Sequence, residues 1–158
     1  MREQWDKNIR DFVIFSAEEK LQILAVGGGA VNFHGYRRHS ADVDFWINTT
    51  KSNLERLKRV LKKMNLEIDS FPDEVKEQKQ NVSLNFSPAS LNIELITKFS
   101  VNKTFEQAYE DSVLVELEDD QYLKWNVLSF DDLITSKIKY NRPKDLMDVQ
   151  ELIRIKEQ

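Results

Sequence analysis

The sequence predicts a mixed α/β (α+β) fold, in which helices pack on a small mixed β-sheet and further helices follow at the C-terminus. An apolar strand over residues 21–26 runs into three glycines, and a strand of alternating polarity follows over 42–47. Apolar residues repeat at helical spacing over 54–64. Two further stretches, 82–96 and 113–125, alternate around polar turns and therefore predict two hairpins.

Five more helices complete this expectation: residues 6–15, 30–36, 104–109, 129–140 and the segment that Pro143 opens. Ser52 and Glu55 have the spacing of a capping box and predict the start of the helix over 54–64. The crossing helix over 30–36 predicts that the strands on either side of it pair in an antiparallel or mixed arrangement. The apolar residues of the last helix that are expected to face inward are Leu146, Val149, Leu152 and Ile153.

Length and composition predict one folded domain over residues 1–158. The apolar fraction of 41% and the aromatic residues (9 Phe, 4 Tyr and 3 Trp) exclude a disordered chain. The absence of cysteine excludes disulfides and thiolate metal sites. A net charge of −4 argues against a protein that coats nucleic acid.

The sequence also indicates a cytoplasmic protein with no membrane partner. Its N-terminal residues are polar and lack the apolar core of a signal peptide. No apolar run approaches the length that a membrane-spanning helix needs.

The strand over 42–47 carries two carboxylates, Asp42 and Asp44, on one face, because side chains alternate along a strand. Two ionised carboxylates side by side repel each other unless a cation lies between them, and oxygen ligands favour Mg²⁺ or Mn²⁺. The backbone N–H groups of Gly27, Gly28 and Gly29 offer a place to hold a phosphate. This combination points to chemistry on a nucleoside triphosphate.

A third acid, Glu94, lies in the middle of the predicted strand over 91–96 among apolar neighbours. A carboxylate is costly there unless it is paired or bound to a metal. Together, Asp42, Asp44 and Glu94 are the candidate catalytic and metal-binding residues.

A glycine pair at a strand end, followed by Asp-x-Asp and a later acid, resembles the DNA polymerase beta-like nucleotidyltransferase superfamily. The residues Gly28-Gly29-Ala30, His34-Gly35, Arg38, Ser40, Asp42, Asp44 and Trp46 sharpen the resemblance to small bacterial nucleotidyltransferases of the abortive-infection toxin type. Either Gly27–Gly28 or Gly28–Gly29 supplies the matching pair. The C-terminal run from Ser136-Lys137 to Asp148-Val149 also looks like this family's end helices.

The resemblance implies a nucleotidyltransferase fold and transfer of a nucleoside monophosphate from a triphosphate to an acceptor hydroxyl. In such a reaction, metal-bound carboxylates neutralise the phosphates and position the attacking oxygen. The glycine N–H groups and the Ser40 hydroxyl would hold the triphosphate, and Arg38, Lys137 and Lys144 would neutralise it. The competing interpretation of these three cations is that they form ordinary surface salt bridges.

The resemblance further implies a toxin of a toxin–antitoxin or phage-defence pair that modifies tRNA or protein and binds a cognate antitoxin. Two alternatives remain open: an antibiotic nucleotidyltransferase acting on small molecules, or a degenerate module that binds nucleotides or a partner. His34 and His39 lack enough neighbouring ligands for zinc, so packed or hydrogen-bonded histidines are expected. Trp46 is expected to pack at the strand end.

Overall fold

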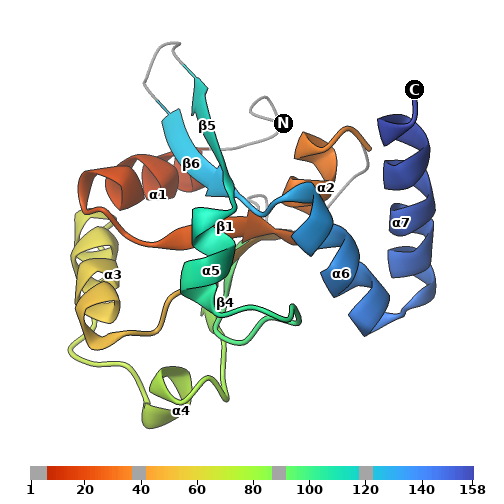
Figure 1. Cartoon of the computed structure of the whole chain (residues 1–158). Coiled ribbons are helices and arrows are strands. Elements are labelled where there is room, and N and C mark those ends of the chain that lie inside the picture. Colours follow the sequence, from red (N-terminus) through yellow and green to blue (C-terminus); the bar gives the residue numbers. More distant parts are fainter. Residues whose placement is uncertain (1–6, 37–41, 87–91, 118–122) are drawn as a thin grey trace.

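The computed structural model of the chain describes residues 7–36, 42–86, 92–117 and 123–158 (Figure 1). Its strands form one mixed sheet in the order β3-β4-β2-β1-β6-β5. Their bounds are β1 (Ile23–Val26), β2 (Asp42–Ile47), β3 (Val82–Leu84), β4 (Asn92–Ile96), β5 (Val113–Leu117) and β6 (Leu123–Val127). The helices are α1 (Lys7–Glu18), α2 (Gly27–Phe33), α3 (Lys51–Lys63), α4 (Asp73–Lys76), α5 (Phe105–Glu110), α6 (Phe130–Tyr140) and α7 (Pro143–Lys156). The predicted α/β class is confirmed.

The centre of the sheet combines both kinds of strand pairing. β1 runs antiparallel to β2 and parallel to β6, and β2 runs parallel to β4. The outer strands β3 and β5 close antiparallel hairpins with β4 and β6. Both predicted hairpins are therefore confirmed, and of the antiparallel or mixed arrangement expected for the first two strands, the antiparallel one is found.

Buried apolar side chains from the strands and helices form one core cluster. β1 is buried along its whole length, as its apolar sequence predicts for a central strand. Phe12 of α1 meets Phe45 of β2, with ring centroids 5.5 Å apart. Trp46 packs against the rings of Phe99 and Phe105, which confirms its expected structural role.

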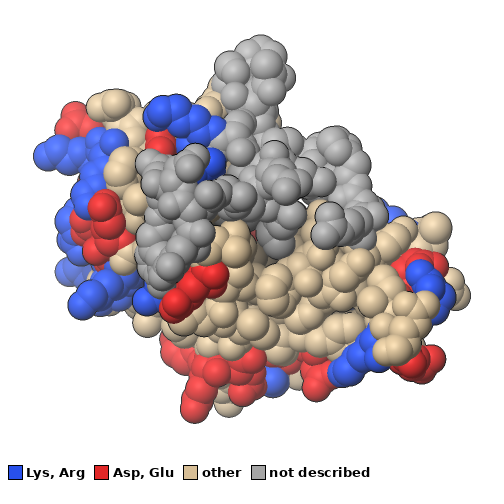
Figure 2. Space-filling view, turned by 90° about the horizontal axis from the view of Figure 1, so that it is seen from above, with Lys and Arg blue, Asp and Glu red and all other residues tan. Residues whose placement is uncertain are grey.

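Helices cover the sheet at two ends of the molecule: α1 and α3 on the left of Figure 1, α6 and α7 on the right. The basic outer face of α3 is tied to α1, because Arg59 and Lys63 each lie 2.8 Å from a carboxylate oxygen of Glu19. Figure 2 shows charges of both signs intermingled on this side of the molecule. No helix within the described ranges combines the length and apolar character needed to cross a membrane.

The start of α3 differs from the expected capping box. Thr50, not Ser52, is the N-cap, and its hydroxyl accepts a hydrogen bond from the Asn53 backbone N–H. Asn53 is itself buried, where its amide bonds the backbone of Gln22 and Asn48 and so joins the ends of β1 and β2. With this tertiary anchor, the helix starts two residues earlier than the Ser52–Glu55 spacing indicates.

The inward face of α7 also differs from the prediction. Leu152 is buried as expected, but Leu146 and Ile153 are 43% and 41% exposed. The buried positions are instead Asp145, Asp148 and Leu152. Two carboxylates occupy the inner face because a buried cation on α6 meets them, so apolar periodicity alone places this helix in the wrong rotation.

We expect Thr50→Ala to lower the free energy of unfolding by about 1 kcal/mol, because one N–H of the first turn of α3 loses its acceptor. The matched control Ser52→Ala should change it by less than about 0.5 kcal/mol, since Ser52 is exposed and does not cap the helix. Denaturant unfolding of both variants measures the difference. Equal losses in the two variants would contradict this assignment of the cap.

Candidate active site

The three predicted acids lie together on two adjacent parallel strands. Asp44 of β2 is paired in register with Glu94 of β4, and Asp42 with Asn92. Residues two apart on a strand share a face, so Asp42, Asp44 and Glu94 all project from the same side of the sheet. Residues about fifty positions apart in the chain are thereby brought side by side.

The surroundings of Asp44 strongly shift the pKa of its carboxyl group. Burial, followed by the negative charges of Asp42 and Glu94, raises the pKa of Asp44 to about 6. The positive charges of Lys137 and Lys144 act in the opposite direction but do not cancel the increase. The ionised form of Asp44 is therefore costly, and a cation beside its carboxylate would lower that cost.

Gly27 approaches the Asp44 carboxylate more closely than any side chain would allow. A Cβ at residue 27 would lie 2.6 Å from Asp44 Oδ2. The φ angle of Gly27, +62°, is also one that residues with a side chain rarely adopt. Val26, which precedes it, is paired in register with Asp44 across β1 and β2. The first glycine is thus needed for the backbone to pass beside the acid.

The other two glycines lie in the first turn of α2. This helix begins at Gly27, three residues before the predicted start, so the glycines belong to the helix instead of preceding it. Gly28 is buried, whereas a Cβ on Gly29 would meet nothing within 4 Å. The side of this turn at Gly29 is therefore open to a group that approaches the backbone.

A pocket of about 230 Å³ opens beside Asp44 and Gly27. Its walls come from β2, from the ends of β1 and β4 with the residues that follow them, and from α6 with the segment after it. The lining residues are Val26, Gly27, Asp44, Ile96, Phe99, Ser136, Lys137, Tyr140 and Arg142. Tyr140 lies edge-on to Phe99, with centroids 6.2 Å apart, and the Arg142 guanidinium lies 5.4 Å from the Tyr140 ring centre. Asp44 therefore shares a pocket with aromatic rings and two cations, whereas Asp42 and Glu94 are not among the residues that line it.

Phe99, Tyr140 and Arg142 were not predicted as nucleotide-binding residues. They lie in loops or at a helix end, far from the glycine and aspartate motifs in sequence. The short spacing between Tyr140 and Arg142 is the sequence feature that could have indicated them, because an aromatic ring two residues from an arginine permits cation–π contact.

Lys137 has a buried position between the pocket and α7. Its Nζ lies 3.4 Å from Asp145 Oδ1 and 3.1 Å from Asp148 Oδ2, and all three residues are at most 5% exposed. Arg142 also donates to Asp145, at 3.1 Å from Nη2. Burial acts to raise the pKa of Asp145, but the Arg142 hydrogen bond and the Lys137 charge hold it below its usual value.

Glu94 is held by a neighbouring strand, since the Ser83 hydroxyl donates to its Oε2 at 2.6 Å. Among the described residues, no group of three or more His, Cys, Asp or Glu could hold a metal ion as arranged. A carboxylate pair suffices for Mg²⁺, which usually keeps waters and substrate phosphates as its remaining ligands. The oxygen donors of Asp42 and Asp44 fit such an ion.

The remaining predicted residues lie at different places. Lys144 is exposed near the start of α7, close enough for its charge to act on Asp44. His34 packs between Phe33 and Phe130, with Nε2 2.9 Å from the Leu128 carbonyl oxygen, as expected for a structural histidine. Arg38, His39 and Ser40 lie outside the described residues.

The comparison with protein families matches nearly the whole chain. Residues 3–157 match the family described as "Nucleotidyltransferase of unknown function (DUF6036)". The chain belongs to this family. A search of curated proteins finds no match. Membership of this family supports the expectation that the chain is a nucleotidyltransferase, and it does not identify a substrate.

The raised pKa of Asp44 predicts a pH-dependent stability. Without metal, its ionisation opposes folding, so the stability of the wild type relative to Asp44→Asn should fall as pH rises from about 4 to about 6. Above pH 6 Asp44→Asn should be the more stable protein, by on the order of 2 kcal/mol.

Denaturant unfolding in EDTA across this pH range measures the effect. Asp69→Asn, in an exposed loop, controls for the substitution itself. Parallel stability curves for Asp44→Asn and the wild type would contradict the prediction.

The buried position of Lys137 predicts a large structural penalty for its loss. Lys137→Met leaves Asp148 and Asp145 buried without this cation and should cost about 3–5 kcal/mol of unfolding free energy. Lys139→Met, on the exposed side of the same helix, should cost less than about 0.5 kcal/mol. Urea unfolding distinguishes these outcomes, and similar stabilities for the two variants would refute the structural role.

Proposed function

We propose that this protein transfers a nucleoside monophosphate from a nucleoside triphosphate to an acceptor hydroxyl, with Mg²⁺ or Mn²⁺ as cofactor. The observation that carries the proposal is the position of Asp44. It lies between Gly27 and Glu94, its pKa is raised by burial and by the neighbouring acids, and it lines a pocket with cationic and aromatic walls. Family membership supports the same reaction class.

In the proposed mechanism, Asp42 and Asp44 hold the metal ion that accompanies the triphosphate. When bound, this ion neutralises charge on the phosphates. Lys137, Lys144 and Arg142 add positive charge from the α6–α7 side of the pocket, and the open turn at Gly29 offers backbone N–H groups to phosphate oxygens. The Arg38 and Ser40 side chains are proposed to contact the triphosphate as well.

The reaction forms a bond between the acceptor oxygen and the α-phosphorus and breaks the bond from that phosphorus to pyrophosphate. The acceptor hydroxyl loses its proton during attack. We assign that proton to Glu94 Oε1, because the Ser83 hydroxyl already donates to Oε2 and fixes the orientation of the carboxylate.

The pocket between Phe99, Tyr140 and Arg142 is proposed to receive the nucleoside. A ring and a guanidinium offer flat surfaces on which a base can stack. The acceptor is proposed to be tRNA or protein, and a toxin role with a cognate antitoxin in the cytoplasm follows from the resemblance to abortive-infection nucleotidyltransferases.

Incubation with four α-labelled triphosphates, Mg²⁺, total RNA and cell protein tests transfer. We expect label to enter a macromolecule, and Asp42→Asn, Asp44→Asn and Glu94→Gln to reduce it to background. Asp69→Asn should retain full activity, because this exposed carboxylate is remote from the pocket in sequence and is not among the residues that line it.

Thermal unfolding provides the second readout. A triphosphate at about a hundred times its Kd should stabilise the protein by about 2.7 kcal/mol, and only when Mg²⁺ is present. Metal-dependent stabilisation without transfer would favour a degenerate binding module, and label on a small molecule alone would favour the antibiotic-modifying type. The proposal would be overturned if the protein showed no metal-dependent stabilisation by any triphosphate and no transfer of label.

A further inference from the structure

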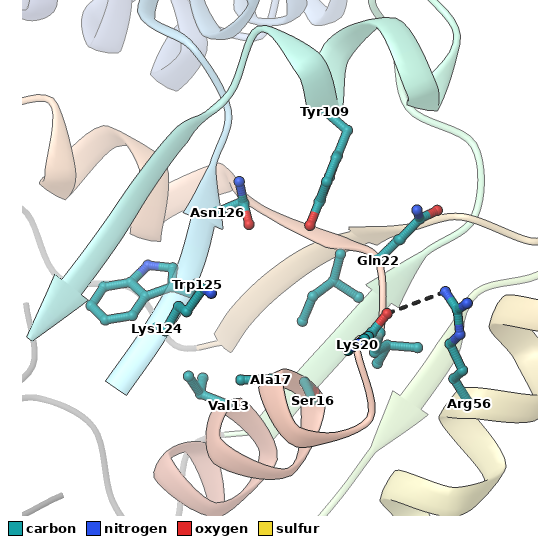
Figure 3. Close-up of a pocket in the computed structure, with 12 residues that line it drawn as sticks. Val13, Ser16, Ala17, Lys20, Gln22, Arg56, Tyr109, Lys124, Trp125 and Asn126 are labelled. Atoms are coloured by element: carbon teal, nitrogen blue, oxygen red, sulfur yellow. Dashed lines mark hydrogen bonds between the residues drawn. The ribbon is translucent and has the colours of Figure 1, made fainter. Parts of the chain in front are cut away.

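A second pocket, of about 350 Å³, lies at the opposite end of β1 from the acids (Figure 3). Leu21, Gln22 and Ile23 line it, whereas Val26 at the other end of the strand is paired with Asp44. Three residues of extended strand separate the two places by about 10 Å. The second pocket shares no lining residue with the pocket at Asp44.

The charge of this second pocket has one sign. Of the described residues that line it, Lys20, Arg56 and Lys124 are cationic and none is acidic. Arg56 Nη1 donates to the Lys20 carbonyl oxygen at 3.3 Å, which uses one of the five N–H donors of the guanidinium. Lys124 is exposed and lies opposite Glu116 in the β5–β6 register. Three cations from α3, β6 and the α1–β1 connection therefore surround one opening.

Two aromatic residues contribute to the walls between these cations. Figure 3 shows Tyr109 extending from α5 toward Gln22, with Trp125 on β6 across the pocket. Tyr109 is half-buried and stacks on Phe105, with ring centroids 5.6 Å apart. Its ring is therefore held in place, and the pocket has fixed flat surfaces as well as charge.

The floor of the pocket includes a polar group with an unmet hydrogen-bonding requirement. Ser16 of α1 is 4% exposed, and within the described residues its Oγ has no hydrogen-bond partner. A buried hydroxyl without a partner costs free energy, and such groups are uncommon in folded proteins. A polar atom of a bound molecule would satisfy it.

We propose that this pocket binds a small organic anion that carries a flat ring. The anionic group lies among Lys20, Arg56 and Lys124, the ring lies along Tyr109 and Trp125, and a polar edge reaches Ser16. The volume lies at the lower end of the range for small-molecule sites, about 300–1,000 Å³. This site is independent of the proposed transferase function.

Three probes separate the contributions of charge and ring: phenyl phosphate, phenol and inorganic phosphate. Each is titrated into the full chain in EDTA and followed by amide and tryptophan indole NMR signals. We expect phenyl phosphate to saturate a site that includes the Trp125 indole and the Ser16 and Tyr109 amides. Phenol and inorganic phosphate should each bind at least about tenfold more weakly, because each lacks one half of the recognition.

The Arg56→Gln, Lys124→Gln double variant should weaken phenyl phosphate binding at least about tenfold. Lys62→Gln, an exposed cation on α3 outside the pocket, and Asp44→Asn, in the other pocket, should both bind as the wild type does. Both substituted cations lie on the surface, and thermal unfolding of the double variant verifies that it is folded.

Four results would overturn the proposal. These are no saturable binding of phenyl phosphate, equal binding of inorganic phosphate, undiminished binding in the double variant, or signal changes centred on Gly27 and Asp44. EDTA and the Asp44→Asn substitution each prevent metal-dependent binding at the acid site. A negative result for phenyl phosphate under these conditions therefore counts against the second pocket alone and not against the transferase proposal.

Discussion

The site depends on the placement of β2 between β1 and β4. Antiparallel pairing with β1 sets Asp44 opposite Val26, beside the backbone turn at Gly27, and parallel pairing with β4 sets it beside Glu94. A shift of one residue in either register would turn the acids to the opposite face of the sheet. The fully buried strand β1 and the Asn53 amide, which bonds the ends of β1 and β2, hold this register.

A second constraint connects the C-terminal helices to the site. Lys137 of α6 forms buried ion pairs with Asp145 and Asp148 of α7. These ion pairs fix how α6 and α7 pack together. Burial of charges is favourable only when each finds its partner, so the cluster selects one arrangement of the two helices. That arrangement places Tyr140 and Arg142 at the mouth of the pocket that contains Asp44.

The two ends of β1 have opposite electrostatic character. At its C-terminal end, burial and the neighbouring carboxylates Asp42 and Glu94 raise the pKa of Asp44. At its N-terminal end, three cations line a pocket without an acidic lining residue among those described. The proposed metal site and the proposed anion site therefore lie at opposite ends of one buried strand. Membership of the nucleotidyltransferase family supports the first proposal in its coarse form and does not bear on the second.

The sequence by itself determined the α/β class, both hairpins and the paired acids, because strand alternation and helical periodicity are local properties. It also determined the separation of Gly27, Asp42 and Asp44 along the chain. Only the tertiary structure decided that Glu94 joins them, since strand order and register depend on contacts between distant segments. The inward face of α7, the cap at Thr50 and the pocket at Ser16 were likewise decided by packing. In each case a partner far away in sequence outweighs the local pattern: Lys137 draws two carboxylates inward, and Asn53 anchors α3 to the sheet.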